Sequence, residues 1–107
     1  MNKIKLMADY HCHPLWIYDD TDDLLDNGVP EEISLSSELR SALDRWSHLY
    51  DQTMNFDDPY MSPGFASPAE EDAFEIEGRR LWKELQSELG GEYKVVYYSS
   101  RESRLVD

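Results

Sequence analysis

The chain has 107 residues, with 23 Asp and Glu against ten Lys and Arg, which gives a formal net charge of −13. This balance argues against binding to nucleic acid or to an anionic membrane, since both need basic patches. Hydrophobic residues make up 40% and aromatic residues 12% of the chain, more than a disordered acidic tail contains. We therefore expect one folded domain over residues 1–107.

The sequence also predicts a compartment. No apolar run is long enough for a transmembrane helix, and the N-terminal residues lack the apolar segment and cleavage site of a secretory signal. The one cysteine, Cys12, cannot form an internal disulfide, which fits a reducing environment. These features predict a cytoplasmic protein.

Two short strands are predicted near the start of the chain. Residues 3–8 (KIKLMA) alternate between two faces, as expected for a half-buried strand. Residues 14–18 (PLWIY) are aromatic, and the leading proline places this second strand at a sheet edge or at its own first position. Residues 19–32 contain an Asn-Gly pair and a proline, so we predict a loop there.

Two helices are predicted next. Residues 38–53 place apolar side chains on one face at three- and four-residue spacing, and a serine pair just before them can cap the helix. A second helix should begin after Ser67, because the sequence SPAE combines an N-cap serine, a proline at the first helical position and a glutamate at the third. We expect Gly90-Gly91 to stop this helix in the left-handed conformation.

A last strand is predicted at residues 92–99 (EYKVVYYS), which are rich in β-branched and aromatic side chains. Residues 100–107 should form a frayed tail. The predicted fold class is α+β, in the order β-(β)-α-α-β. It is a small sheet of two or three strands with a two-helix hairpin packed on one face.

Neither the acidic segments nor the histidines predict a metal site. An EF-hand with Gly28 at its sixth position would have Leu25 at the third and Ser34 at the twelfth, where oxygen ligands are needed. His11 and His13 could share one side of a strand, but zinc needs three or four protein ligands and the sequence offers no second cysteine. We expect two ordinary histidines flanking a buried thiol, with no metal and no cofactor.

No catalytic motif stands out. Cys12 lies beside histidines, but the orienting group and oxyanion donors that a thiol nucleophile needs cannot be identified. No glycine-rich phosphate loop is present, and carboxylates are too numerous for any pair to indicate acid–base catalysis. We predict that the protein is not an enzyme.

The acidic residues are concentrated in two segments that contain no Lys or Arg. Eight lie between Asp19 and Leu39, and eight more lie between Asp51 and Gly78. Such runs are more often solvated surfaces than binding sites. A surface that meets a basic partner is the functional alternative.

Four stretches of the chain together resemble a known family: KLMADYHCHPLW, SPGF, FEIEGRRLWKELQSELG and YKVVYYS. They are similar to small, acidic, cytosolic immunity proteins from bacterial polymorphic-toxin and contact-dependent growth inhibition loci. The resemblance covers most of the chain. It implies a protein that binds and neutralises one toxin domain.

The charge suggests how such binding would work. Many secreted toxin domains are nucleases, whose clefts must be positive to hold phosphates. An acidic inhibitor can occupy such a cleft with carboxylates in place of phosphates, and electrostatic steering would speed association. We therefore expect a monomer that forms a one-to-one complex with a basic toxin domain. The alternative is an acidic adaptor that binds a basic host protein.

Candidate toxin-binding residues lie within and beside the acidic segments, because binding residues tend to collect on loops and need an aromatic anchor amid the charges. Each aromatic could equally be a core residue. Phe56 and Phe65 are two further possible anchors. The predicted set is Trp16, Tyr18, Asp19, Asp20, Asp22, Asp23, Asp26, Asp57, Asp58 and Tyr60.

Overall fold

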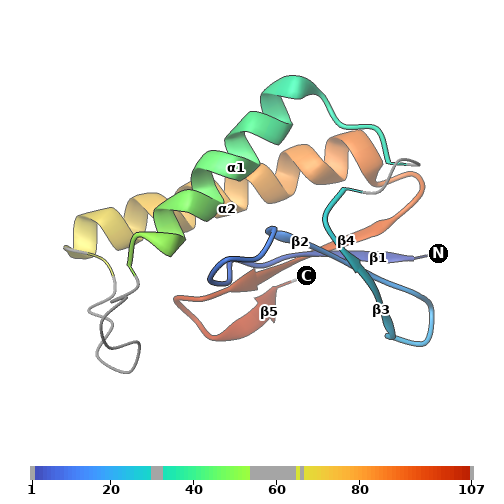
Figure 1. Ribbon diagram of the computed structural model, residues 1–107, viewed down its shortest axis with the longest axis horizontal. Helices are drawn as coiled ribbons and strands as arrows, with labels where there is room; N and C mark the ends of the chain where they lie inside the picture. The colour runs from blue at the N-terminus through green and yellow to red at the C-terminus, as the bar shows by residue number, and fades with distance from the viewer. Residues whose placement is uncertain (1, 30–32, 54–64, 66, 107) are drawn as a thin grey trace.

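The computed structural model describes residues 2–29, 33–53, 65 and 67–106, and these form one sheet and two helices. The elements follow in the order β1 (Lys3–Leu6), β2 (Leu15–Tyr18), β3 (Leu24–Asn27), α1 (Ser37–Asp51), α2 (Pro68–Leu89), β4 (Lys94–Ser99) and β5 (Arg104–Val106). Figure 1 shows the two helices lying together over one face of the sheet. The predicted α+β class with a helical pair on one sheet face is confirmed.

The sheet is mixed, with strands in the order β3-β2-β1-β4-β5. The central pair, β1 and β4, is parallel, and the other three pairs are antiparallel. A parallel pair needs a long crossover connection, and here the two helices lie within that connection. The helices therefore cover the face of the sheet that the crossover passes.

The sheet has five strands where two or three were predicted. Leu24–Asn27 form β3 inside the predicted loop 19–32, and Arg104–Val106 form β5 inside the predicted frayed tail. Both are short edge strands, and the residues of β3 are mostly exposed, so neither carries the hydrophobic alternation that marks a strand in sequence. Their backbone hydrogen bonds to β2 and β4 define them instead.

The core lies between the sheet and the helices. Alternate residues of β1 and β2 are buried against the helical layer, as predicted for half-buried strands. The helices contribute Leu39, Leu43 and Trp46 from α1, and a matching apolar stripe from α2. Trp46 stacks on Phe74 with ring centroids 4.6 Å apart, which joins the two helices at the centre of the core.

Both predicted N-caps are present. The Ser36 hydroxyl accepts a hydrogen bond from the Leu39 amide at 3.2 Å, and the Ser67 hydroxyl accepts one from the Glu70 amide at 3.2 Å. These bonds satisfy amides that have no partner within their own helix. The first helix spans Ser37–Asp51, slightly shorter than its predicted range at the C-terminal end.

The predicted left-handed stop at the end of α2 is wrong. Gly90 has φ −63° and ψ −14°, which is right-handed, and its amide donates to the Gln86 carbonyl at 2.8 Å. The amide of Tyr93 then donates to the Leu89 carbonyl, so the chain leaves the helix through a further turn. Helical hydrogen bonding therefore continues through Gly90 into a turn that leads to β4.

A buried carboxylate ties α2 to β4. Glu75 is only 6% exposed, although it belongs to one of the segments without Lys or Arg. Its oxygens accept hydrogen bonds from the Tyr97 hydroxyl (3.0 Å), the Ser99 hydroxyl (2.8 Å) and Nε of Arg79 (3.1 Å). Burial, reinforced by the Glu75 charge, raises the pKa of Tyr97, so the phenol remains a donor. These partners are what make a buried charge tolerable.

One glycine lets α2 approach the core closely. A Cβ atom at Gly78 would lie 2.6 Å from the Tyr97 hydroxyl oxygen and 2.9 Å from Cζ2 of Trp46. Contacts this short do not occur without movement of the neighbouring atoms. The absence of a side chain at Gly78 therefore sets how near the helix lies to β4 and α1.

We expect Gly78→Ala to lower the free energy of unfolding by about 1–2 kcal/mol, because the added methyl group must displace packed side chains. Helix propensity alone predicts the opposite sign, since alanine is favoured over glycine by about 1 kcal/mol inside a helix. Urea denaturation followed by circular dichroism measures the difference. Ser87→Ala, on the exposed side of α2, is the control and should be neutral or slightly stabilising. A rise in the unfolding free energy of Gly78→Ala would contradict this close packing.

Candidate functional site

The first part of the first acidic segment, residues 19–27, forms the turn and second strand of a β-hairpin with β2. We use "acidic hairpin" for Asp19, Asp20, Asp22, Asp23 and Asp26, which lie in the turn between β2 and β3 and in β3 itself. The Asp19 carboxylate accepts hydrogen bonds from the Thr21 amide (2.8 Å), the Thr21 hydroxyl (2.7 Å) and the Asp23 amide (3.0 Å). The turn between the strands is therefore fixed by hydrogen bonds, where the sequence predicted only a loop.

These hydrogen bonds keep the Asp19 carboxyl ionised. The Thr21 hydroxyl makes the largest contribution and the backbone amides of Asp23 and Thr21 add to it, and together they lower the pKa of Asp19. The stabilisation from such a carboxyl is complete at a pH above the ordinary pKa of aspartate. It is lost as the pH falls through the lowered pKa of the folded protein. The turn is thus held by a charged group throughout the neutral range.

The next turn residue connects the hairpin to the centre of the sheet. Asp22 has φ 65°, in the left-handed region that aspartate tolerates better than most residues. Its carboxylate lies 2.7 Å from Nζ of Lys3, which comes from β1. The ion pair is exposed, so it orients the two side chains more than it stabilises the fold.

Arginine neutralises acids elsewhere in the molecule. In the part of the chain that the structure describes, every ion pair formed by an arginine lies along α2 or in the turn before β5. Arg80 binds Glu77 and Glu84, Arg101 binds acids at the start of α2, and Arg79 and Arg104 meet at Glu102. Positive charge from arginine is therefore concentrated away from the acidic hairpin, where Lys3 of β1 pairs with Asp22.

Trp16 and Tyr18 adjoin the acidic hairpin on the sheet face opposite the helices. Both are half-buried, and they alternate along β2 with Leu15 and Ile17, which face the core. Lys5 extends over both rings, with its Nζ 6.0 Å from the Trp16 centroid and 5.1 Å from that of Tyr18. The structure thus places both predicted aromatic residues outside the core and next to the carboxylates.

A family model described as Serratia CdiI immunity protein-like matches residues 2–100. The chain belongs to this family. The match spans the acidic hairpin, both helices and β4, and it confirms the resemblance seen in four sequence stretches. Membership implies an immunity protein that neutralises a toxin. A search of curated protein sequences finds no match.

The second group of predicted contacts in this CdiI-like protein cannot be placed. Asp57, Asp58, Tyr60 and Phe56 lie outside the described residues. Phe65 is described, and its ring centroid lies 4.9 Å from that of Phe74, against the core. For Phe65 the structure therefore supports core packing over an exposed anchor.

The segment with two histidines is not a strand, and Cys12, which was expected to be buried, is only partly buried. His11 has φ 59° and lies in a turn, and Nδ1 of His13 accepts a hydrogen bond from the Leu15 amide at 3.1 Å. Burial lowers the pKa of His13, and burial with nearby Asp9 and Asp51 raises the pKa of the Cys12 thiol. A raised pKa makes the thiol a poorer nucleophile at neutral pH.

Neither metal binding nor membrane crossing finds support among the described residues. No group of three or more His, Cys, Asp or Glu side chains within these ranges is arranged to hold a metal ion. No helix within them combines the length and apolar character that a membrane crossing needs.

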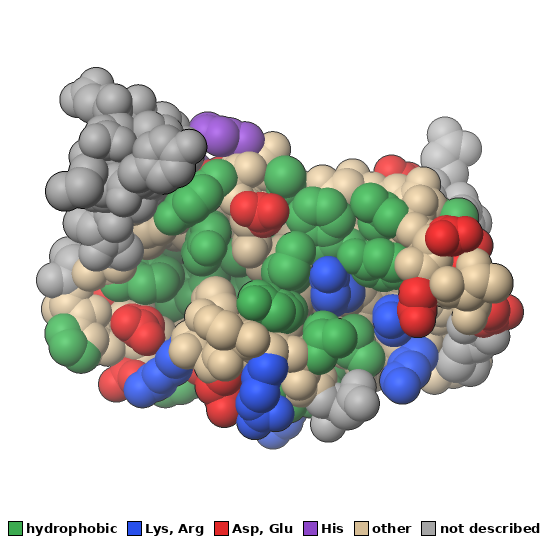
Figure 2. Space-filling model, turned by 90° about the horizontal axis from the view of Figure 1, so that it is seen from below, with side chains coloured by type: hydrophobic (Ala, Val, Ile, Leu, Met, Phe, Trp, Pro, Cys, Tyr) green, Lys and Arg blue, Asp and Glu red, His purple; other side chains and the backbone are tan. Residues whose placement is uncertain are grey.

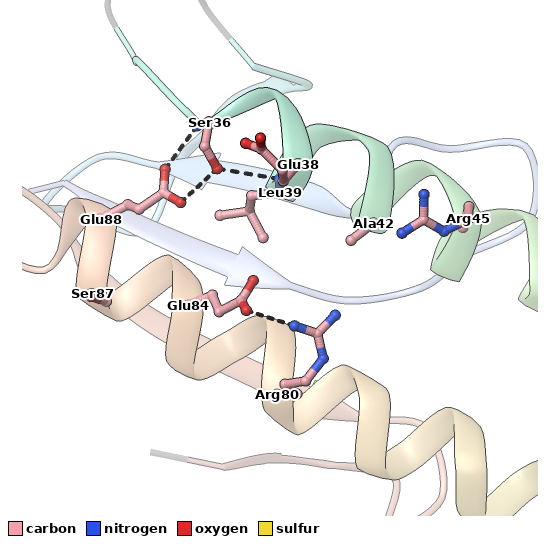
Figure 3. A pocket seen from close by; sticks show the side chains of 9 residues that line it. All are labelled: Ser36, Glu38, Leu39, Ala42, Arg45, Arg80, Glu84, Ser87 and Glu88. Atoms are coloured by element: carbon pink, nitrogen blue, oxygen red, sulfur yellow. Dashed lines mark hydrogen bonds and ion pairs between the residues drawn. The ribbon is translucent and has the colours of Figure 1, made fainter.

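An open groove of about 380 Å³ lies between α1 and α2 on their outer side (Figure 3). Glu88 of α2 accepts hydrogen bonds from both the amide and the hydroxyl of Ser36, and Arg80 binds Glu84. The bonds between Ser36 and Glu88 join the start of α1 to α2. Because these polar groups already bind one another, they are not directed toward a ligand.

We expect Asp19→Ala to open the hairpin turn without unfolding the protein. Loss of the carboxylate leaves the Thr21 and Asp23 amides without their acceptor, so their hydrogen exchange should become about three- to tenfold faster. Amide exchange followed by NMR makes the measurement. Asp26→Ala removes the same charge from β3 and should leave both amides unchanged. Equal exchange in Asp19→Ala and the parent protein would show that the carboxylate does not hold the turn.

Proposed function

We propose that this protein neutralises a cognate, basic, nuclease-type toxin domain by binding in its positively charged active-site cleft. The acidic hairpin carries the proposal, because hydrogen bonds hold its turn in place before any partner binds. Family membership supports the neutralisation of a toxin. In this proposal the protein acts in the cytoplasm as a monomer, forms a one-to-one complex, and uses no cofactor or catalysis of its own.

The hairpin carboxylates are suited to replace phosphates. A nuclease cleft holds its substrate with Arg and Lys side chains, and carboxylates accept the same charge-assisted hydrogen bonds from arginine forks. Hydrogen bonds to Asp19 fix the turn before binding. Less conformational entropy is then lost when the complex forms.

The charge distribution favours rapid capture. The net charge of −13 attracts a basic domain from a distance, and arginine compensation along α2 leaves the hairpin as a negative region at the edge of the sheet. Steering of this kind raises association rates and weakens as salt is added. Fast binding suits an inhibitor that must act before the toxin cleaves its substrate.

Co-expression with the toxin domain encoded beside this protein's gene tests the function. We expect cells that carry both to survive, and the purified pair to form a one-to-one complex in which the toxin no longer cleaves nucleic acid. Light scattering gives the stoichiometry, and a nuclease assay gives the inhibition. Growth arrest despite equal expression of both proteins would reject the immunity function. Protection by a complex that still cleaves nucleic acid would reject occlusion of the active site.

Removing two hairpin charges should slow association with that toxin domain. We expect Asp22→Asn with Asp23→Asn to lower the association rate about three- to tenfold at low salt and to flatten its salt dependence. Asparagine tolerates the left-handed conformation at position 22, so the turn is preserved. Stopped-flow kinetics at several salt concentrations measures both effects.

The matched control removes the same charge from acids that arginine already neutralises. Glu77→Gln with Glu84→Gln eliminates two carboxylates that bind Arg80. This pair should change the association rate much less than the hairpin pair. Equal slowing by both pairs would mean that only the net charge matters and that the hairpin is no contact surface.

A further inference from the structure

We propose that the toxin domain docks across the open face of the sheet, with the acidic hairpin at the border of the interface. This inference rests on the proposed function and extends it to a surface that the predicted contacts reach only at Trp16 and Tyr18. The open face is the side of the sheet away from the helices. Its apolar members are Trp16, Tyr18, Leu24, Val96, Tyr98 and Leu105.

Strand register places these side chains together. Tyr18 lies opposite Leu24 on β3, Lys5 lies between Trp16 and Val96, and Tyr98 lies opposite Leu105 on β5. The alternate residues of β4 point to the helices, since Tyr97 and Ser99 both bind Glu75. Figure 2, viewed from the sheet side, shows hydrophobic side chains across much of this face, with charged ones both among them and along its border.

This composition is unusual for a sheet with one face in water. Such sheets normally alternate apolar residues toward the core with polar residues toward solvent. Here four of the five strands contribute apolar side chains to the outer face, while β1 contributes Lys3 and Lys5, and Leu24 and Leu105 are 52% and 49% exposed. Val96 is only 3% exposed although no described helix covers it, so its open-face neighbours pack around it. A packed apolar face of this kind marks an interaction site.

Two lysines partly cover the aromatic rings in the free protein. Nζ of Lys3 lies 5.3 Å from the Tyr18 centroid while it binds Asp22, and Lys5 lies over Trp16 and Tyr18. Lysine stems shield apolar surface and keep their charge in water. The lysines therefore shield the aromatic rings of the open face from water. A partner can displace the lysines without breaking any contact within the core.

The charge of the molecule selects the partner. Two copies that each carry −13 repel one another, and face-to-face contact would bring their acidic hairpins to the same interface. A basic domain is attracted to the acidic hairpin, and it can place an apolar patch on the open face. Trp and Tyr are the residues that most often dominate binding energy at such surfaces. The fitting occupant is thus the basic toxin domain, with apolar side chains at the centre of its surface.

Substitution of two open-face residues tests the inference. We expect Tyr98→Ser with Leu105→Ser to raise the dissociation constant for the toxin domain encoded beside the gene about tenfold or more, mainly through faster dissociation. The control is Leu49→Ser with Ile76→Ser, which removes two exposed apolar side chains from the helical layer and should change binding little. Surface plasmon resonance gives the rates, and thermal melting shows whether each variant folds. Leu105→Lys alone, on an exposed edge strand, replaces the double variant if that variant is unfolded.

The outcomes separate this inference from the proposed function. If the parent protein does not bind the toxin domain, the proposed function fails and the docking surface with it. If the parent binds and the helical pair weakens binding more than the open-face pair, the interface lies on the helices and only this inference is overturned. A dimer of the parent protein that dissociates on Tyr98→Ser with Leu105→Ser would assign the face to a second copy, which also overturns it.

Discussion

The buried carboxylate of Glu75 determines how this fold is assembled. It joins α2 to β4 through the Tyr97 and Ser99 hydroxyls, and Arg79 brings the turn before β5 into the same network through Glu102. Hydrogen bonds from several donors compensate for the loss of water around a charge. The network sets which face of β4 meets the helices, and so which face of the whole sheet is left for other contacts.

The two layers consequently have different surface chemistry. Along α2, Arg80 pairs with both Glu77 and Glu84, although seven acids against three bases leave this helix net negative. On the sheet side, acids gather in the β2–β3 turn beside aromatic rings. The acidic hairpin thus lies beside exposed apolar side chains of the sheet. Family membership implies that the partner of this protein is a toxin.

Local sequence signals predicted the helices well and the edge of the sheet poorly. Ser67 and the apolar stripes were readable because capping and helical periodicity depend on neighbouring residues. β3 and β5 were missed because their hydrogen bonds to β2 and β4 define them, and no local pattern reports those partners. The burial of Glu75 was missed because Tyr97 and Ser99, two of its three hydrogen-bond donors, lie more than twenty positions away. The acidic hairpin was found by composition, whereas Tyr98 and Leu105 became visible only once the strand order was known.

The parallel central pair of strands has a consequence for the order of folding. Residue 3 pairs with residue 94, so the middle of the sheet joins segments separated by both helices. Contacts between distant parts of a chain form late, because a long loop must close before they are gained. During synthesis, the hairpin of β2 and β3 leaves the ribosome long before β4 and β5 exist. The open face is therefore complete only after β4 and β5 have been made, and a nascent chain offers acidic charge before it offers the complete surface.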